Sequence, residues 1–454
     1  MRILYTLVLL FGFLILSGQS VIDDMLYKIA KAPSAERLET DIQTLVDFGT
    51  RHTLSDTVSE TRGIGAARRW LHSEFERISK DCSDCLEVSY QRNLVAGDPE
   101  SRIREDTWVV NVLAVQRGTV YPNRYVIMSG DIDSRVSDPL DGTSDSPGAN
   151  DNASGLAGTL EAARILSKYK FSTSIIYVGL SGEEQGLFGG KGLAEYATEQ
   201  GWDIIGILNN DMIGNIEGID GVKDNVTFRV FSEPDYPNEG ERERIWNRFY
   251  GGEVDGPSRQ LARYVHRLTE QYCTNLRAIM IYRLDRFGRG GHHRPFNDAG
   301  FPGVRIMETH ENYNRQHQDL RVENGIAYGD VIAGVDFDYC AKLTGVNAIT
   351  LAALASAPPP PQQLQIGGAV QPSTRLRWDP PASDDGLLAG YRVYWRDTTS
   401  PIWQYSRYVP ATETQVVLEN VVVDNYLFGV AAVGQDGAES LVVFPRSLIP
   451  RGIR

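Results

Sequence analysis

Acidic side chains follow three apolar runs of the sequence, close to the point where each run ends. In order they are Asp131 and Asp133 after 124–128, Glu183 and Glu184 after 174–180, and Asp211 after 204–208. A polar loop at 129–155 adds Asp151, and a later stretch adds His317. Carboxylates that a fold brings together repel one another unless they are solvated, protonated or neutralised by a cation. These residue types therefore favour a divalent metal ion and metal-assisted hydrolysis.

An α/β sheet would bring these acids together. Apolar runs rich in β-branched residues predict buried strands at 107–115, 124–128, 174–180, 204–208 and 303–307. Segments between and around them are predicted to be helical from the spacing of their apolar residues, at about 21–78, 155–169, 259–272 and 336–355. This alternation predicts a mostly parallel central sheet with helices on both faces, and ligands collect beyond the carboxyl ends of such strands. The polar stretch 214–257 is predicted to be an insertion outside the sheet.

Several short motifs resemble those of one peptidase family. They are PGANDNASG at 147–155, SGEEQGLFGG at 181–190, NNDMIG at 209–214 and the late His317 with Asp319 two residues on. Their order and spacing are similar to those of the co-catalytic zinc exopeptidases, which include bacterial leucyl aminopeptidase, aminopeptidase Y and glutamate carboxypeptidase. The resemblance covers roughly 38–355. It implies a zinc exopeptidase-like fold and a metal-dependent exopeptidase, in the first place an aminopeptidase.

The resemblance also implies a role for each residue of the motifs. Asp151 would bridge two divalent ions, zinc in the first place, and Glu184 and His317 would complete the ligands of one ion. Asp211 would bind the other ion. Glu183 would be the general base that takes a proton from a metal-held water. Two ions roughly 3.5–4 Å apart would polarise the scissile carbonyl and hold the free amino terminus of the substrate.

The first motif departs from the family pattern. Relatives have His-x-Asp, in which the histidine binds a metal and the aspartate orients it, whereas this chain has Asp131-Ile-Asp133. Asp131 could bind the ion itself, in a site that accepts manganese or another oxygen-preferring ion. Alternatively the site is weak or empty and one metal remains, or activity is lost. The intact base and other ligand positions favour the first outcome, with Asp133 needing a proton, a cation or a donor such as Arg135.

Other histidines lie near the motifs in sequence. His310 is a rival to His317 as a ligand, but His317 has the following aspartate that the family pattern shows. His292 and His293 stand in GGHHRPFNDAGFPG, which resembles the segment before the family's last strand. We therefore place His293 in the substrate pocket or behind a metal ligand, with a purely structural role as the alternative.

The composition of the chain divides it into four parts. Residues 1–20 have Arg2 and an apolar run followed by small residues, as in a cleaved signal peptide, which predicts a secreted or periplasmic protein. Residues 21–356 form the predicted peptidase domain and 357–363 a proline-rich linker. Short alternating runs at 364–450 predict an all-β immunoglobulin-like sandwich. Its GYRVYW at 390–395 and the run from Tyr426 resemble a fibronectin type III domain, with Trp378 in the core.

The net charge of the chain limits the kinds of partner that it can bind, and its cysteines predict one disulfide. The net charge of −14, with no basic cluster, argues against nucleic acid, and no later stretch is apolar enough to span a membrane. We expect peptide or protein substrates. The aromatic residues Tyr394, Trp395, Trp403 and Tyr405 leave a contact with a surface or polysaccharide open for the C-terminal domain. Cys82 and Cys85 predict a local disulfide, while the state of Cys273 and Cys340 stays open.

Two other functions stay open at this point. A degenerate peptidase fold could keep a structural ion and serve as a binding protein, but the intact Glu183 and Asp211 argue against it. A single-zinc glutaminyl cyclase would use the same fold, and the paired metal ligands argue against that. The sequence does not separate exopeptidase from endopeptidase action, because the pocket walls lie in loops.

Overall fold

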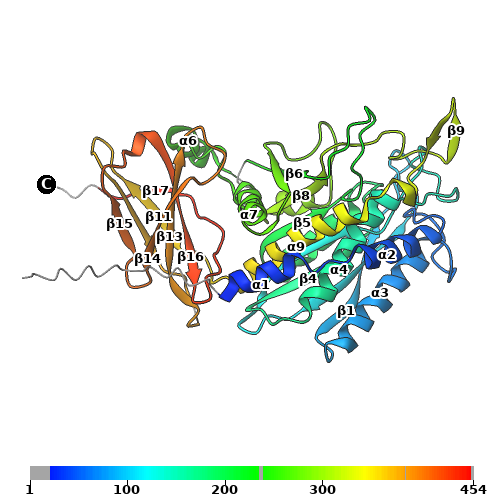
Figure 1. The fold of residues 1–454 in the computed structure, drawn as a ribbon, viewed down its shortest axis with the longest axis horizontal. Coiled ribbons are helices and arrows are strands. Elements are labelled where there is room, and N and C mark those ends of the chain that lie inside the picture. Colours follow the sequence, from blue (N-terminus) through cyan, green and yellow to red (C-terminus); the bar gives the residue numbers. More distant parts are fainter. Residues whose placement is uncertain (1–20, 235–238, 384, 451–454) are drawn as a thin grey trace, which may run out of the picture.

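An eight-stranded sheet forms the centre of the larger domain (Figure 1). The computed structural model describes residues 21–234, 239–383 and 385–450, so the predicted signal peptide lies outside the described residues. The strand order is β1-β2-β4-β3-β5-β8-β6-β7. The strands are β1 (Leu86–Val95), β2 (Thr107–Gln116), β3 (Tyr121–Asp131), β4 (Thr173–Leu180), β5 (Asp203–Asn210), β6 (Thr227–Ser232), β7 (Arg277–Ile281) and β8 (Gly303–Glu308).

The four central strands of the sheet are parallel, antiparallel pairs join them to the outer strands, and the edge strands β6 and β7 are again parallel to each other. Strands β4, β3, β5 and β8 pair in parallel, whereas β1 with β2, β2 with β4, and β6 with β8 are antiparallel. Only residues 117–120 separate β2 from β3, too few for the crossover that parallel strands require. The predicted parallel arrangement is thus confirmed for the central strands, and the sheet as a whole is mixed.

The prediction that 214–257 lies outside the sheet is wrong. Strand β6, which spans Thr227–Ser232, lies between β8 and β7 and buries Phe228 and Val230. Because polar loops flank this short strand, its few apolar residues do not stand out as a separate run within the longer polar stretch. Helix α6 (Glu241–Tyr250) follows it.

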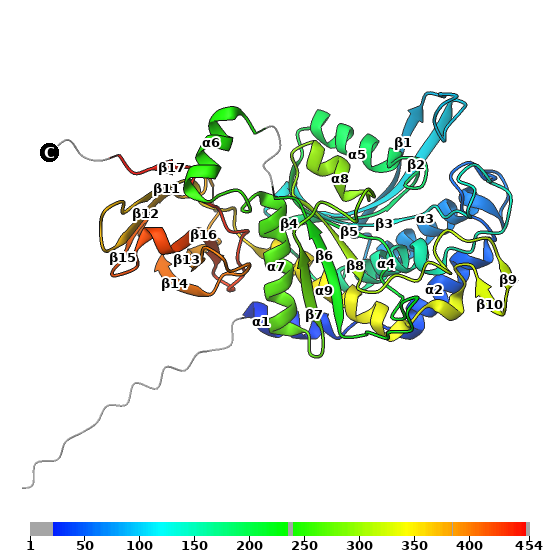
Figure 2. The ribbon, with the colours of Figure 1, turned by 90° about the horizontal axis from the view of Figure 1, so that it is seen from above.

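Helices cover both faces of the sheet (Figure 2). Helices α5 and α8 pack with Ile127, Ile176 and Val178 on one face, and the larger apolar core lies on the other face under α1–α4, α7 and α9. Ser34 and Asp336 cap α2 and α9 through their side chains, and Pro257 begins α7, where no N–H donor is needed. The helices are α1 (Val21–Ala30), α2 (Ala35–Asp47), α3 (Gly63–Asp81), α4 (Gly155–Leu166), α5 (Phe188–Glu199), α7 (Pro257–Tyr272), α8 (His293–Asp298) and α9 (Phe337–Ser356).

The C-terminal domain consists of two small sheets. Their strand orders are β15-β12-β11-β17 and β14-β13-β16. Trp378 is buried and its ring meets that of Tyr391 at a centroid distance of 5.1 Å. The domain is all-β, and its likeness to fibronectin type III stays a prediction. Its strands are β11 (Gln362–Gly367), β12 (Thr374–Asp379), β13 (Leu388–Asp397), β14 (Tyr405–Pro410), β15 (Gln415–Leu418), β16 (Tyr426–Gly434) and β17 (Ser447–Leu448).

The C-terminal domain is joined to α7 by buried ion pairs and lies directly beside the larger domain (Figure 1). Asp255 accepts from Arg396 of β13 at 2.7 Å and from Arg263 of α7 at 2.8 Å, and all three side chains are almost fully buried. Arg263 also donates to the main-chain oxygen of Pro401 at 2.8 Å. Because these groups are shut off from water, the two domains form one continuous interior at this junction.

A second buried carboxylate lies at the same junction. Glu439 pairs with Arg392 at 2.6 Å and with Arg267 of α7 at 3.3 Å. The Tyr394 hydroxyl donates to Glu439 at 2.5 Å, and the Trp403 ring lies near the guanidinium groups of two arginines of the junction. Tyr394 and Trp403 therefore serve the domain junction and not an open contact surface.

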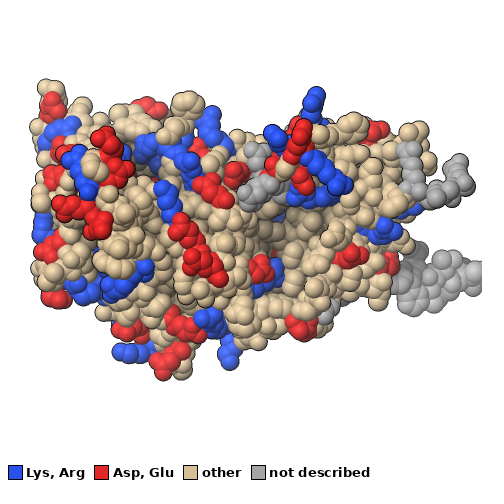
Figure 3. Space-filling model, turned by 180° about the vertical axis from the view of Figure 1, so that it is seen from behind, with Lys and Arg blue, Asp and Glu red and all other residues tan. Residues whose placement is uncertain are grey.

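Several smaller features complete the fold. The predicted Cys82–Cys85 disulfide is confirmed, and Cys273 and Cys340 are free thiols. None of the helices in the described part of the chain is both long enough and apolar enough to cross a bilayer. Positive and negative side chains are interspersed over the face of the molecule drawn in Figure 3.

Candidate metal centre

The candidate site lies at the carboxyl ends of the central strands, as predicted. Strand β3 ends at Asp131, and its register places Asp131 beside Leu180 of β4 and Gly130 beside Asn210 of β5. Glu183 and Asp211 follow directly after these partner strands. Parallel pairing therefore brings three separate sequence motifs to one edge of the sheet.

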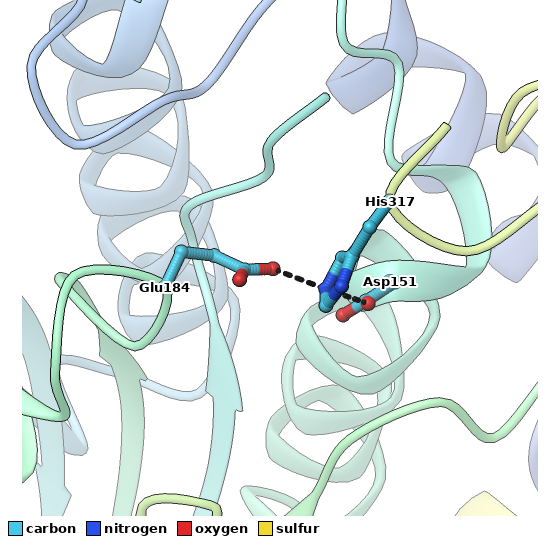
Figure 4. Close-up of side chains that lie close together, drawn as sticks. All are labelled: Asp151, Glu184 and His317. Atoms are coloured by element: carbon cyan, nitrogen blue, oxygen red, sulfur yellow. Dashed lines mark hydrogen bonds and ion pairs between the residues drawn. The ribbon is translucent and has the colours of Figure 1, made fainter. Parts of the chain in front are cut away.

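Three of the predicted ligands converge on one point. Ligand atoms of Asp151, Glu184 and His317 all lie within 4.8 Å of one another. Figure 4 shows the two carboxylates reaching the imidazole, with His317 Nε2 at 3.0 Å from Asp151 Oδ2 and at 3.0 Å from Glu184 Oε1. Two carboxylate oxygens and one imidazole nitrogen with a position open to water are a donor set that zinc accepts. The residues present therefore fit one divalent ion.

The loop that carries Asp151 is held by a buried aspartate. The carboxylate of Asp330 accepts the main-chain N–H of Asn150 at 3.0 Å and that of Asp151 at 2.6 Å. Burial raises the pKa of Asp330 to about 6, although these two N–H groups act in the opposite direction. The N–H bonds fix the direction in which Asp151 leaves the loop, so Asp330 positions a candidate metal ligand from behind.

Arg135 holds the other two donors. Its Nε donates to Glu184 Oε2 at 2.7 Å, and its Nη2 lies 2.6 Å from Nδ1 of His317. The predicted alternative, that Arg135 would neutralise Asp133, does not match these contacts. Glu184 Oε2 and His317 Nδ1 thus each have a fixed partner in Arg135, while Glu184 Oε1 and His317 Nε2 face each other.

Asp133 lies beneath the segment that carries the base. It accepts the Thr53 hydroxyl at 2.9 Å and the main-chain N–H groups of Glu183 at 3.3 Å and Glu184 at 3.1 Å. Burial and the neighbouring Glu184 raise the pKa of Asp133. Asp133 thus lies behind the candidate base Glu183 and the candidate ligand Glu184 and fixes the main chain of both.

Asp131 does not join the three converging donors. Its Oδ1 lies 2.6 Å from Nδ1 of His292, and its Oδ2 accepts the side-chain amide of Asn152 at 2.7 Å. Both residues of the Asp131–His292 pair are buried. Each carboxylate oxygen therefore already has a protein partner.

Asp211 faces an arginine that the sequence analysis did not single out. Arg305 Nη2 lies 2.8 Å from Asp211 Oδ2, and Nη1 contacts both oxygens of Asp285 at 3.1 Å. Oδ1 of Asp211 is buried with no protein partner. Burial raises the pKa of Asp211 to about 8, although Arg305 pulls it down. Over the described residues, the three converging ligands are the only such group of three or more metal-binding side chains.

The other histidines take structural positions. His293 is fully buried, with Nε2 at 2.7 Å from the Leu284 main-chain oxygen. It is absent from the described cavity lining, and its contact with Leu284 ties the first residue of α8 to the loop before that helix. His310, the rival ligand, lies 3.8 Å from Asp224, away from the converging donors.

A cavity of about 660 Å³ opens over the site. Glu183, Asp211 and the three converging ligands line its floor. Burial, together with the carboxylates of Glu184 and Asp211, raises the pKa of Glu183. The cavity is large enough for several atoms of a peptide to lie against the candidate base.

Sequence reasoning missed several positioning residues. Arg305 stands in an apolar strand, and a buried arginine requires an acidic partner, so that strand carried a usable signal. Asp330 lies in an irregular segment far from any motif, and nothing near it in the sequence indicates that it reaches the Asp151 loop.

Comparisons with known proteins agree with this geometry. The family model described as Peptidase family M28 matches residues 111–324. A probable zinc metalloprotease of Pyrenophora tritici-repentis is 40% identical over 426 residues, covering 93% of this chain and 87% of the relative. A probable zinc metalloprotease of Leptosphaeria maculans is 41% identical over 413 residues, covering 91% of this chain and 94% of the relative.

Solved structures show the same fold. The Legionella pneumophila LapA aminopeptidase has a TM-score of 0.54 at 18% identity, covering 74% of this chain and 75% of that one. An aminopeptidase from Aneurinibacillus sp. strain AM-1 has a TM-score of 0.51 at 14% identity, covering 73% of this chain and 96% of that one. The similarity to the Pyrenophora and Leptosphaeria relatives covers 93% and 91% of this chain and goes further than the fold. This chain belongs to peptidase family M28.

Proposed function

We propose that the protein is a zinc-dependent exopeptidase that removes residues from the amino terminus of peptides. The observation that carries the proposal is the convergence of Asp151, Glu184 and His317 beside Glu183 at the floor of one cavity. The names of the fungal relatives support zinc as the metal.

A zinc ion held by these three residues would act as a Lewis acid, which polarises the carbonyl of the scissile bond and lowers the pKa of a bound water. Glu183 reaches the cavity from the residue before the ligand Glu184, and Asp133 fixes its main chain. A raised pKa makes this carboxylate a better proton acceptor. Glu183 takes the proton of the attacking water and passes it to the leaving amine.

Asp211 supports action at a free amino terminus. Its Oδ1 is buried, has no protein partner and belongs to a residue that lines the cavity floor. A substrate ammonium group would satisfy this oxygen with a charge-assisted hydrogen bond. We therefore give Asp211 the role of binding the substrate's amino terminus.

The sequence predicted two ions, and we propose that one ion serves the site. Asp131 is engaged by His292 and Asn152, and Asp211 is paired with Arg305. Both oxygens of Asp131 and Oδ2 of Asp211 thus have partners from the chain itself, while Oδ1 of Asp211 is left for the amino terminus of the substrate. The positive charge of Arg305 is permanent and compensates Asp211 without a metal.

The described residues bring together one set of metal donors. Glutaminyl cyclase activity, which requires a single zinc, is therefore the second candidate function. An assay panel separates the possibilities. Aminopeptidase action predicts turnover of aminoacyl p-nitroanilides and none of the same compounds with acetylated amino termini. Cleavage of internal bonds would indicate an endopeptidase, pyroglutamyl product from glutaminyl peptides would indicate the cyclase, and binding without turnover would indicate a degenerate peptidase.

Secretion and the nature of the C-terminal domain complete the proposal. The signal-like sequence at 1–20 supports export, and the two-sheet C-terminal domain supports a fibronectin type III-like accessory domain. Amino-terminal sequencing of protein from the culture medium should give a start close to Val21. Retention of residues 1–20 in protein found only inside cells would contradict export.

A further inference from the structure

Arginines line the cavity above the candidate metal site. Four of them come from the loop between β1 and β2 and from residues 286–294, and we call this set the arginine wall. It consists of Arg102, Arg286, Arg289 and Arg294. Apart from the acids of the floor, Glu100 is the one acidic residue among the described residues of the cavity lining. The wall therefore carries a local excess of positive charge on a protein whose net charge is −14.

Two of the four arginines are already engaged by the protein. Arg286 donates to Glu311 at 2.9 Å, and Arg102 donates to the main-chain oxygen of Glu184. Two of the four acids of the floor have arginines from outside the wall, since Arg135 binds Glu184 and Arg305 binds Asp211. Among the described residues no ion pair joins Arg289 or Arg294 to an acid of the floor, so direct pairing with the floor does not account for these two arginines.

Arg289 and Arg294 keep free donors at the cavity. The guanidinium of Arg289 has no partner among the described residues, and its main-chain N–H bonds to the Arg286 oxygen at 3.0 Å in a turn. Arg294 lies 3.9 Å from Asp298, with more than half of each side chain exposed, so this ion pair is weak. An arginine fork binds a carboxylate through two parallel hydrogen bonds.

We propose that the arginine wall selects peptides that carry a carboxylate close to the scissile bond. This inference rests on the proposed peptidase site for the position of the peptide. Asp211 and the converging ligands hold the amino end at the floor, and Arg289 and Arg294 contact a carboxylate one or two residues away. The carboxylate belongs to an aspartate or glutamate side chain, or to the free carboxyl end of a dipeptide.

Peptide binding to the Glu183→Gln protein loaded with zinc tests the inference without requiring turnover. Calorimetry would compare Leu-Glu-Ala amide with Leu-Gln-Ala amide, which differ in one charge, and Leu-Ala with Leu-Ala amide, which differ at the carboxyl end. We expect the acidic member of at least one pair to bind roughly tenfold more tightly, as for a hydrogen bond to a charged group. The first pair reports a side-chain carboxylate and the second a terminal one.

Arg289→Ala should abolish that preference, and Arg289→Glu should reverse it toward Leu-Lys-Ala amide. Arg283→Ala is the matched control, because Arg283 is an exposed arginine of the same loop that stacks on Phe287 and is not in the described cavity lining. Equal binding within both pairs, or a preference that survives Arg289→Ala, would overturn the inference. Selective binding by a wild-type protein that cleaves none of the peptides would instead retain the inference and contradict the peptidase function.

Discussion

Asp131 and His292 form a buried pair in which Oδ1 of the aspartate lies 2.6 Å from Nδ1 of the histidine. Relatives with the His-x-Asp motif would place a metal-binding histidine at position 131. Here the acid is at 131 and the imidazole comes from the segment before α8. This pair occupies one oxygen of Asp131, which is why we propose one ion where the motifs imply two.

The number of zinc ions bound by variants at positions 131 and 292 tests whether Asp131 is a metal ligand. Wild-type protein and Asp131→Asn should each bind one zinc per chain, because Asp131 is not a ligand of that ion. The double variant Asp131→His with His292→Asp restores a metal-binding imidazole with an acid behind it, and should bind up to two. His317→Ala, which removes a converging ligand, should bind none after dialysis, with His310→Ala as its control.

Elemental analysis against protein concentration gives these ratios. Two zinc ions in the wild type and one in Asp131→Asn would show that Asp131 binds a metal. That result would return the site to the two-ion arrangement predicted from the motifs.

Asp133→Asn tests the residue beneath the base. Losing the charge weakens the bonds to the N–H groups of Glu183 and Glu184, so both side chains lose their fixed orientation. We expect activity to fall by roughly 10–100-fold, as for other residues that orient metal ligands. Steady-state kinetics at saturating zinc measures the effect, and Asp138→Asn in the exposed part of the loop 129–155 should leave the rate unchanged. An unaltered rate in Asp133→Asn would show that Asp133 does not orient Glu183 and Glu184.

The motifs predicted the position of the site because strand ends are encoded locally. Asp131, Glu183 and Asp211 each follow an apolar run, and parallel pairing of those runs is enough to bring them together. The partners that decide each acid's role come from far along the chain. His292 lies 161 residues from Asp131, and no periodicity or spacing links the two.

The same limit applies to the domain junction. Composition indicated a separate C-terminal domain after the proline-rich linker, but Arg396 lies 141 residues from its partner Asp255. Strand β6 was missed for a different reason, since it is a short strand within a polar stretch. Local signals therefore predicted five of the eight strands of the sheet and the location of the site, while β1, β6, β7 and the contacts between distant segments required the structure.

Asp255→Asn should destabilise the whole protein. The substitution leaves Arg263 and Arg396 buried without their carboxylate, and breaking one side of a buried ion pair costs about 3–5 kcal/mol. Urea unfolding followed by fluorescence measures the change in the free energy of unfolding. Glu413→Gln, an exposed acid of the C-terminal domain, should change it little. If both variants unfolded like the wild type, the junction would not hold the domains together.

The junction should also weaken in acid. Burial opposes the charge of Glu439, but Arg267 and Arg392 outweigh it and hold the pKa of Glu439 below its ordinary value. A carboxylate with a lowered pKa in the folded state adds stability above the pKa of the unfolded chain, about 4.3, and loses it as the pH falls further. Unfolding free energies between pH 7 and pH 3 should thus fall less steeply for Glu439→Gln than for the wild type. Parallel curves would contradict this.

The central claim is that Glu183 serves as the base beside a metal held by Asp151, Glu184 and His317. Hydrolysis of a leucyl p-nitroanilide by wild-type and Glu183→Gln proteins, each with its zinc content measured, tests it most directly. We predict equal zinc content and a kcat at least 10²-fold lower in Glu183→Gln, the lower range for loss of a general base. Equal kcat values at equal zinc content would contradict the account.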